Sequence, residues 1–74
     1  MTQANELQVE VVDHRMVVRQ RGTSLRAVYV KGDNPWLTLA EVSDDKDAAL
    51  SLSEFRVLAW SAANERAREL GWIA

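Results

Sequence analysis

The sequence predicts an α+β fold: an antiparallel three- to four-stranded β-meander with one C-terminal α-helix packed on one face. Three observations support this class. Apolar and polar residues alternate through much of the region 7–42, which is the period of half-buried strands. Turn-forming residues at 22–23 and 32–35 divide that region into short runs. From Ser51 onward, a helix-capping sequence begins a run of helix-forming residues that continues to Leu70.

Four runs of β-favouring residues are expected to form the sheet, which spans residues 7–42. Alternation predicts strands at 7–12, 16–21 and 24–31, because each run places apolar side chains on one face. The run at 36–42 admits two interpretations. Its β-branched and aromatic residues favour a fourth strand, but the sequence Leu-Thr-Leu-Ala-Glu-Val is also compatible with a short helix.

The helix expected at 51–70 has a recognisable signal at each end. Ser51 and Glu54 have the spacing of a capping box, and Gly71 stands where a left-handed residue ends a helix. On a helical wheel, one broad face carries the apolar residues expected to cover the sheet: Leu52, Phe55, Leu58, Ala59, Ala62, Ala63 and Leu70. Arg66 projects from the middle of this face, and its stem is expected to lie over apolar surface.

The chain, 1–74, is expected to be a single small domain in which 1–5 are frayed and 71–74 form an apolar tail. It has no cysteine and one histidine, so disulfides and thiolate metal sites are excluded, and we expect no metal and no cofactor. No apolar run reaches the roughly 18 residues of a membrane span, and the N-terminal sequence lacks the pattern of a signal peptide. A cytoplasmic protein without a membrane partner is therefore expected.

No motif in the chain indicates catalysis. Asp13 and His14 are a candidate base and its orienting group, but no nucleophile motif such as Gly-x-Ser-x-Gly accompanies them. The segment 44–47, Asp-Asp-Lys-Asp, does not continue with the glycine and glutamate spacing of a calcium-binding loop. The three glycines are isolated, so no phosphate-binding loop is present. We therefore expect a small non-enzymatic binding module.

Charge is segregated along the chain. Residues 14–31 contain five cations and no acid, whereas residues 32–54 contain six carboxylates and one cation. The first functional hypothesis is therefore a nucleic-acid-associated regulator that binds single strands through a basic β-hairpin. Its candidate binding residues are Arg19, Arg21, Arg26 and Lys31, with Tyr29 as a stacking candidate. The alternative is that these charges form a solvated face that balances the acidic loop of the same molecule.

Apolar residues on the flank of the predicted helix suggest a surface of a different kind. The second hypothesis is a protein-interaction module or a small inhibitor, such as a phage or mobile-element product, that contacts a protein partner or forms a homodimer. The candidate interface residues are Val57, Trp60, Asn64, Arg66, Trp72 and Ile73. The alternative is that the apolar C-terminal tail folds back and covers Val57 and Trp60.

The predicted order of elements resembles the single-strand-binding transcriptional coactivator family of positive cofactor 4. The resemblance rests on Val-Val-Arg-Gln-Arg-Gly at 17–22 and Leu-Ser-Leu-Ser-Glu-Phe-Arg-Val-Leu at 50–58, which are similar in kind to that family's first strand and helix start. The chain departs from the family at 44–47, which is acidic instead of rich in lysine and glycine, and in the spacing of the helix start. The resemblance implies a dimer packed through the helix and single-strand binding along the sheet, with Arg19 and Arg21 as the matching positions.

Overall fold

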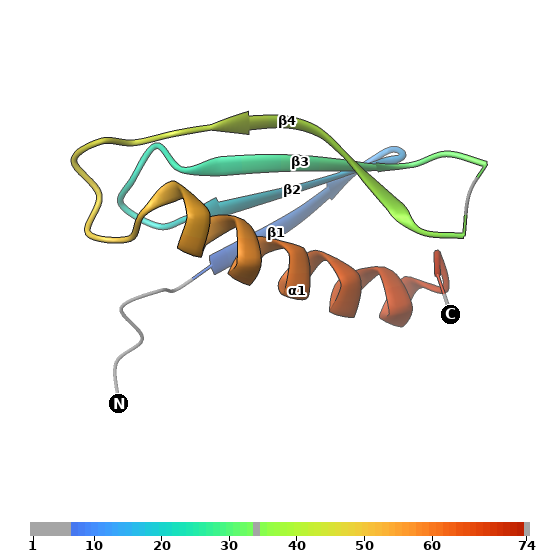
Figure 1. Ribbon diagram of the computed structural model, residues 1–74. Helices are drawn as coiled ribbons and strands as arrows, with labels where there is room; N and C mark the ends of the chain where they lie inside the picture. Colours follow the sequence, from blue (N-terminus) through green and yellow to red (C-terminus); the bar gives the residue numbers. More distant parts are fainter. Residues whose placement is uncertain (1–6, 34, 74) are drawn as a thin grey trace.

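The computed structural model describes residues 7–33 and 35–73, which form one four-stranded antiparallel sheet and one helix (Figure 1). The elements are β1 (Leu7–Val12), β2 (Arg15–Gln20), β3 (Arg26–Lys31), β4 (Leu37–Ser43) and α1 (Leu52–Leu70). The strands lie in the order β1-β2-β3-β4. The predicted α+β meander is therefore confirmed, and the run at 36–42 forms a strand. The fraying expected at 1–5 lies outside the described residues.

The hairpin turns use residues suited to their backbone conformations. Asp13 and His14 join β1 to β2, and Val12 pairs with Arg15 across the turn. Asp13 has a φ of 55°, a left-handed conformation that Asp tolerates because its short polar side chain can bond locally. Gly22, with a φ of 80°, lies in the turn after β2, where a side chain would be strained. Asp13 and His14 thus lie in an exposed turn.

β4 departs from regular pairing at Ala40. Tyr29 pairs with Leu39, but Val28 pairs with Glu41, so Ala40 is an extra residue on β4. Such a bulge bends the strand and increases its twist. Because β4 lies at the edge of the sheet, the bulge also shortens the regular backbone ladder that its outer side offers to another strand.

Both ends of α1 are capped by the predicted residues. The Ser51 hydroxyl accepts the Glu54 backbone N–H at 3.1 Å, and the Glu54 carboxylate accepts the Ser51 N–H at 3.2 Å. Gly71 has a φ of 79°, and the Trp72 N–H donates to the Ala67 carbonyl at 2.8 Å. These bonds satisfy backbone groups that the helix itself leaves unpaired.

A single oblique row of α1 side chains is fully buried. Its members are Phe55, Ala59, Ala63 and Ala67. At 3.6 residues per turn, each step of four advances this row by about 40° around the helix. Met16 and Val18 of β2 lie in the same core. Because the row consists mainly of alanines, little side-chain bulk separates the helix from the sheet.

Two expectations for the helix face are corrected. Leu70 is 39% exposed, and Arg66 is exposed and paired with Glu69 at 2.9 Å. The helical wheel assumed one fixed buried direction, whereas the buried row rotates by about 120° from Phe55 to Ala67. Near the end of the helix the sheet therefore meets Ala67, and Arg66 and Leu70 are turned away from it.

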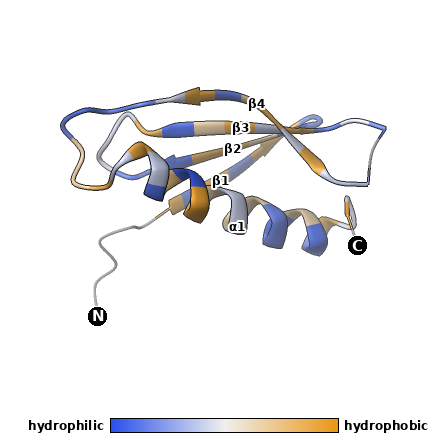
Figure 2. Cartoon of the chain, in the orientation of Figure 1, coloured by the Kyte–Doolittle hydropathy of each residue, from blue (hydrophilic) through white to orange (hydrophobic). Residues whose placement is uncertain are grey.

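The two faces of the sheet differ in character. The face beneath the helix is apolar, and its residues form the core together with α1. Its members include Leu7, Val9, Val11, Met16, Val18, Ala27, Tyr29, Leu37 and Leu39. By alternation, the opposite face carries Glu10, Arg15, Arg19, Arg26 and Glu41, with Val17 and Val28 between them. Hydrophilic and hydrophobic segments likewise alternate along α1 (Figure 2).

Asp45 fixes the acidic connection between β4 and α1 to the turn before β3. Its carboxylate accepts the Ser24 N–H at 2.8 Å and the Asp47 N–H at 3.0 Å. These bonds lower the pKa of Asp45, and the bond from Ser24 has the larger effect. The connection then becomes hydrophobic before α1 (Figure 2), where Ala48 and Leu50 pack against the core.

Replacing Asp45 with Asn is expected to loosen this connection, because a neutral amide accepts hydrogen bonds more weakly than a carboxylate. Amide exchange measured by NMR should be faster at Ser24 in Asp45→Asn. Asp47→Asn should leave it unchanged, since Asp47 takes part through its backbone N–H.

The contact between Asp45 and Ser24 also predicts that stability depends on pH in the acid range. The folded pKa of Asp45 lies below 3.8, so its contribution to stability is present above about pH 3.8 and is lost as the pH falls through the folded pKa. The Ser24 amide signal should follow this titration. A midpoint at or above 3.8 would contradict the contact.

Candidate functional site

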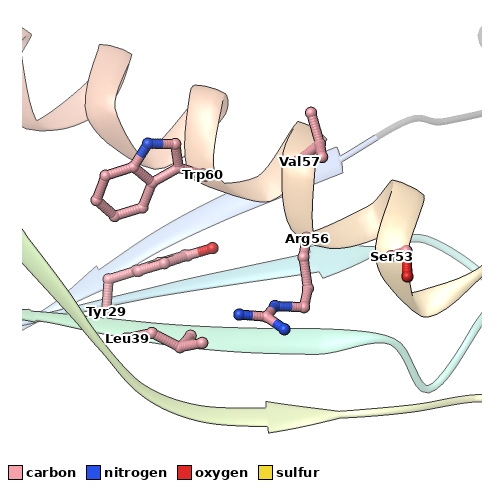
Figure 3. Close-up of a pocket in the computed structure, with 6 residues that line it drawn as sticks. All are labelled: Tyr29, Leu39, Ser53, Arg56, Val57 and Trp60. Atoms are coloured by element: carbon pink, nitrogen blue, oxygen red, sulfur yellow. The ribbon is translucent and has the colours of Figure 1, made fainter.

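The helix leaves one margin of the sheet partly open. α1 packs mainly against β1, β2 and β3, and Figure 1 shows β4 at the edge farthest from β1. A groove of about 500 Å³ lies between α1 and β4, and we call it the α1–β4 groove. It is lined by Tyr29 from β3, Leu39 from β4, and Ser53, Arg56, Val57 and Trp60 from α1 (Figure 3).

An aromatic pair forms one end of the α1–β4 groove. Tyr29 is only 2% exposed, whereas Trp60 is 44% exposed. Their ring centroids are 5.6 Å apart and the ring planes are tilted by 55°. Tilted aromatic pairs contribute about 0.5–1.5 kcal/mol beyond the area they bury. Trp60 therefore covers Tyr29 and still presents part of its indole ring to a ligand.

Arg56 gives the groove its positive charge. It lies one helical turn before Trp60, and its side chain extends from α1 toward β3 and β4 (Figure 3). Burial raises the pKa of Tyr29, and the Arg56 guanidinium partly opposes this rise because it favours the phenolate. Within 7–33 and 35–73, Arg56 forms no ion pair with a carboxylate.

Exposed apolar side chains border the groove. Val57, on the helix side, is 69% exposed. Leu39 of β4 is half-buried in the groove. The border therefore carries apolar surface on both the helix and the edge strand, and the charged groove residue lies between them.

The predicted protein-interface residues do not form one continuous surface in the structure. Val57 and Trp60 line the groove, and the Asn64 side chain donates to the Trp60 carbonyl at 2.7 Å. Trp72 and Ile73 are half-buried against the core beyond the end of α1. The C-terminal tail therefore completes the core there and leaves Val57 and Trp60 exposed. Arg66 is paired with Glu69, as described above.

The predicted nucleic-acid-binding residues are not gathered on one surface. Arg19 and Arg26 face each other across β2 and β3 on the open side of the sheet. Tyr29 lies on the other side, buried beneath Trp60. Arg21 lies in the turn after β2, and the Lys31 ammonium donates to the carbonyl of the following glycine at 2.9 Å. Tyr29 is thus separated by the sheet from the arginines it was expected to accompany.

Two arginines flanked by two carboxylates form a row across the open face of the sheet. Arg19 and Arg26 are directly opposite, an arrangement that is unfavourable for like charges. Arg19 binds Glu10 of β1 at 2.9 Å, and Arg26 approaches Glu41 of β4 at 3.5 Å. Each guanidinium therefore has a carboxylate on its outer side, and the basic segment is partly neutralised by residues distant in the sequence.

Sequence reasoning missed three of the six groove residues: Leu39, Ser53 and Arg56. Ser53 and Arg56 lie four residues before Val57 and Trp60, so all four share one helix flank, and a helical wheel contains that signal. Leu39 has no comparable signal, because its place depends on the strand order and on which flank of α1 faces β4.

No protein-family model matches the chain, and no curated protein or solved structure matches it. The element order agrees with the fold implied by the resemblance to the positive cofactor 4 family, but element order alone does not establish membership. Within the described ranges, no group of three acidic or histidine side chains is placed to hold a metal ion. No helix there is long and apolar enough to cross a membrane. The geometry of the α1–β4 groove therefore carries the functional inference.

Tyr29 is the chain's one tyrosine, so tyrosinate absorbance reports on this groove alone. In the folded protein its titration midpoint should lie above 10, and in denaturant it should return to about 10. The stabilising effect of the neutral phenol is accordingly present below about pH 10 and is lost as the pH rises through the folded pKa.

Replacing Arg56 with Gln is expected to raise the Tyr29 midpoint further, because the guanidinium opposes the effect of burial. Arg66→Gln is the matched control on the same helix and should leave the midpoint unchanged. An unchanged midpoint in Arg56→Gln would show that Arg56 does not face Tyr29.

Proposed function

We propose that this protein is a small protein-interaction module that binds an extended, apolar segment of a partner protein in the α1–β4 groove. The observation that carries the proposal is the partly exposed Trp60 over a buried Tyr29, bordered by the exposed Val57. Aromatic side chains that are rigidly held and partly exposed are typical anchors of protein interfaces.

The position of β4 indicates an extended occupant. The outer side of β4 has no neighbouring strand among the described residues. A segment lying along this edge can therefore form backbone hydrogen bonds with it and insert alternate side chains into the groove. The bulge at Ala40 limits the regular ladder to a few residues, so a side chain anchored against Trp60 must provide much of the affinity.

Nucleic-acid binding is the second candidate, and one observation favours it: Arg15, Arg19 and Arg26 share the open face of the sheet. The carboxylates of Glu10 and Glu41 reduce its positive potential, since both lie next to these arginines. The apolar surface of the groove, by contrast, is already exposed and is not neutralised by neighbouring residues. The geometry therefore supports the protein-binding function better.

Trp60→Ala is expected to weaken binding of a peptide selected from a random displayed library. Truncating an interface tryptophan costs about 2 kcal/mol or more, which is about thirty-fold in affinity. Val57→Gln should also weaken binding, and it tests the same surface at a position 69% exposed, where the fold does not depend on the side chain. Fluorescence anisotropy of the labelled peptide measures each affinity.

Trp36→Ala is the matched control, because Trp36 is 54% exposed but does not line the groove. It should leave the affinity unchanged. Equal losses in Trp36→Ala and Trp60→Ala, with folding intact by circular dichroism, would contradict the proposal. A solution mass showing a dimer that Trp60→Ala converts to a monomer would also contradict it, since a second copy would then occupy the groove.

The nucleic-acid hypothesis predicts binding of a single-stranded oligonucleotide at low salt, with an affinity that falls steeply as salt increases. The double variant Arg19→Ala, Arg21→Ala should abolish it. The double variant Glu10→Gln, Glu41→Gln should strengthen it, because it removes the carboxylates beside Arg19 and Arg26. Unchanged binding in the arginine variant would exclude the basic hairpin as the binding site.

A further inference from the structure

We infer that the α1–β4 groove selects segments in which a carboxylate lies close to the anchoring apolar side chain, and that Arg56 determines this specificity. This inference rests on the proposed function and adds the chemical class of the partner segment to it. In an extended segment that runs along β4, the side chain of Asp or Glu provides the required group.

The surroundings of Arg56 leave its charge available to a ligand. The positions three and four residues away along α1 are occupied by Leu52, Ser53, Ala59 and Trp60, so no helical neighbour offers a carboxylate. Glu10, Glu41 and Glu69 form ion pairs with other arginines: Arg19, Arg26 and Arg66. Among the described residues, the Arg56 guanidinium has no carboxylate partner, and its charge acts on Tyr29 across the groove.

The geometry of the groove places this charge beside the anchor site. Arg56 and Trp60 are one turn apart on α1, and both side chains lie toward β3 and β4 (Figure 3). A planar guanidinium presents its N–H groups as a fork that matches the two oxygens of a carboxylate. A segment whose apolar side chain contacts Trp60 can thus place a nearby carboxylate against Arg56.

The charge count in the groove favours a carboxylate-bearing peptide over a nucleic acid. Arg56 is the one charged residue among the six that line it. Single-strand binding along a phosphate backbone requires a series of cations and several accessible ring faces. Here Tyr29 is buried, and Trp60 offers one partly exposed ring. A single cation beside a single apolar anchor is complementary to one carboxylate and one apolar side chain.

The test uses 3-phenylpropionate and its neutral amide, 3-phenylpropionamide, which differ in charge but share the same apolar group. The indole N–H signals of Trp36, Trp60 and Trp72 serve as separate NMR reporters of the loop, the groove and the tail. Both compounds should shift the Trp60 signal, and the carboxylate should bind about five-fold more tightly at low salt. In Arg56→Gln, the two compounds should bind equally, at the affinity of the amide for the wild type.

Arg66→Gln is the control variant, and it should retain the preference for the carboxylate because Arg66 is paired with Glu69 outside the groove. Equal wild-type affinities for both compounds would overturn the role of Arg56 and leave groove binding in place. If neither compound shifts Trp60, both the groove function and the inference fail. A short oligothymidine that shifts Trp60 at lower concentration than the carboxylate would assign the groove to nucleic acid and overturn the inference.

Discussion

The width of a single helix is the constraint on which the rest of this structure depends. An α-helix with its side chains is about 10–12 Å across, whereas the axes of four adjacent strands span about 14 Å before their side chains are counted. The row of alanines from Ala59 to Ala67 seats α1 close to β2 and its neighbours. Near β4, Trp60 extends from α1 to contact Tyr29. The helix does not cover the rest of this part of the sheet, and the groove lies there.

Folding redistributes the charge that is segregated along the sequence. The meander brings Glu10 from before the basic segment and Glu41 from after it to either side of Arg19 and Arg26. These ion pairs are exposed and contribute little to stability. Their consequence is electrostatic, because they offset the repulsion of two opposed arginines and lower the positive potential of the open face. Arg56, which lies on the helix flank, has no carboxylate partner in the part of the chain that the structure describes.

Local patterns in the sequence predict the elements, whereas the site depends on their assembly. Alternation predicts the strands, and the Ser51–Glu54 capping box and Gly71 predict the helix with its observed ends. The same reasoning finds Trp60 and Val57 but not Leu39, since only the strand order places β4 beside α1. It also groups Tyr29 with the basic residues, because the sequence does not show which face of the sheet each residue occupies until the strand register is known. The rotation of the buried row around α1 similarly explains why a wheel with one fixed buried direction predicts Leu70 as buried, although it is 39% exposed.

The residues that border the groove are poorly explained by stability alone. Val57 is 69% exposed, and valine at an exposed helix position is less favourable than alanine by several tenths of a kcal/mol. A lone exposed apolar residue requires no explanation, but Val57 adjoins Trp60 and Leu39 in one groove. Trp60 stabilises the fold with the side that covers Tyr29, and the rest of its indole gains nothing from contact with water. A partner segment that covers both side chains would recover the hydrophobic free energy that this single helix cannot obtain from its own sheet.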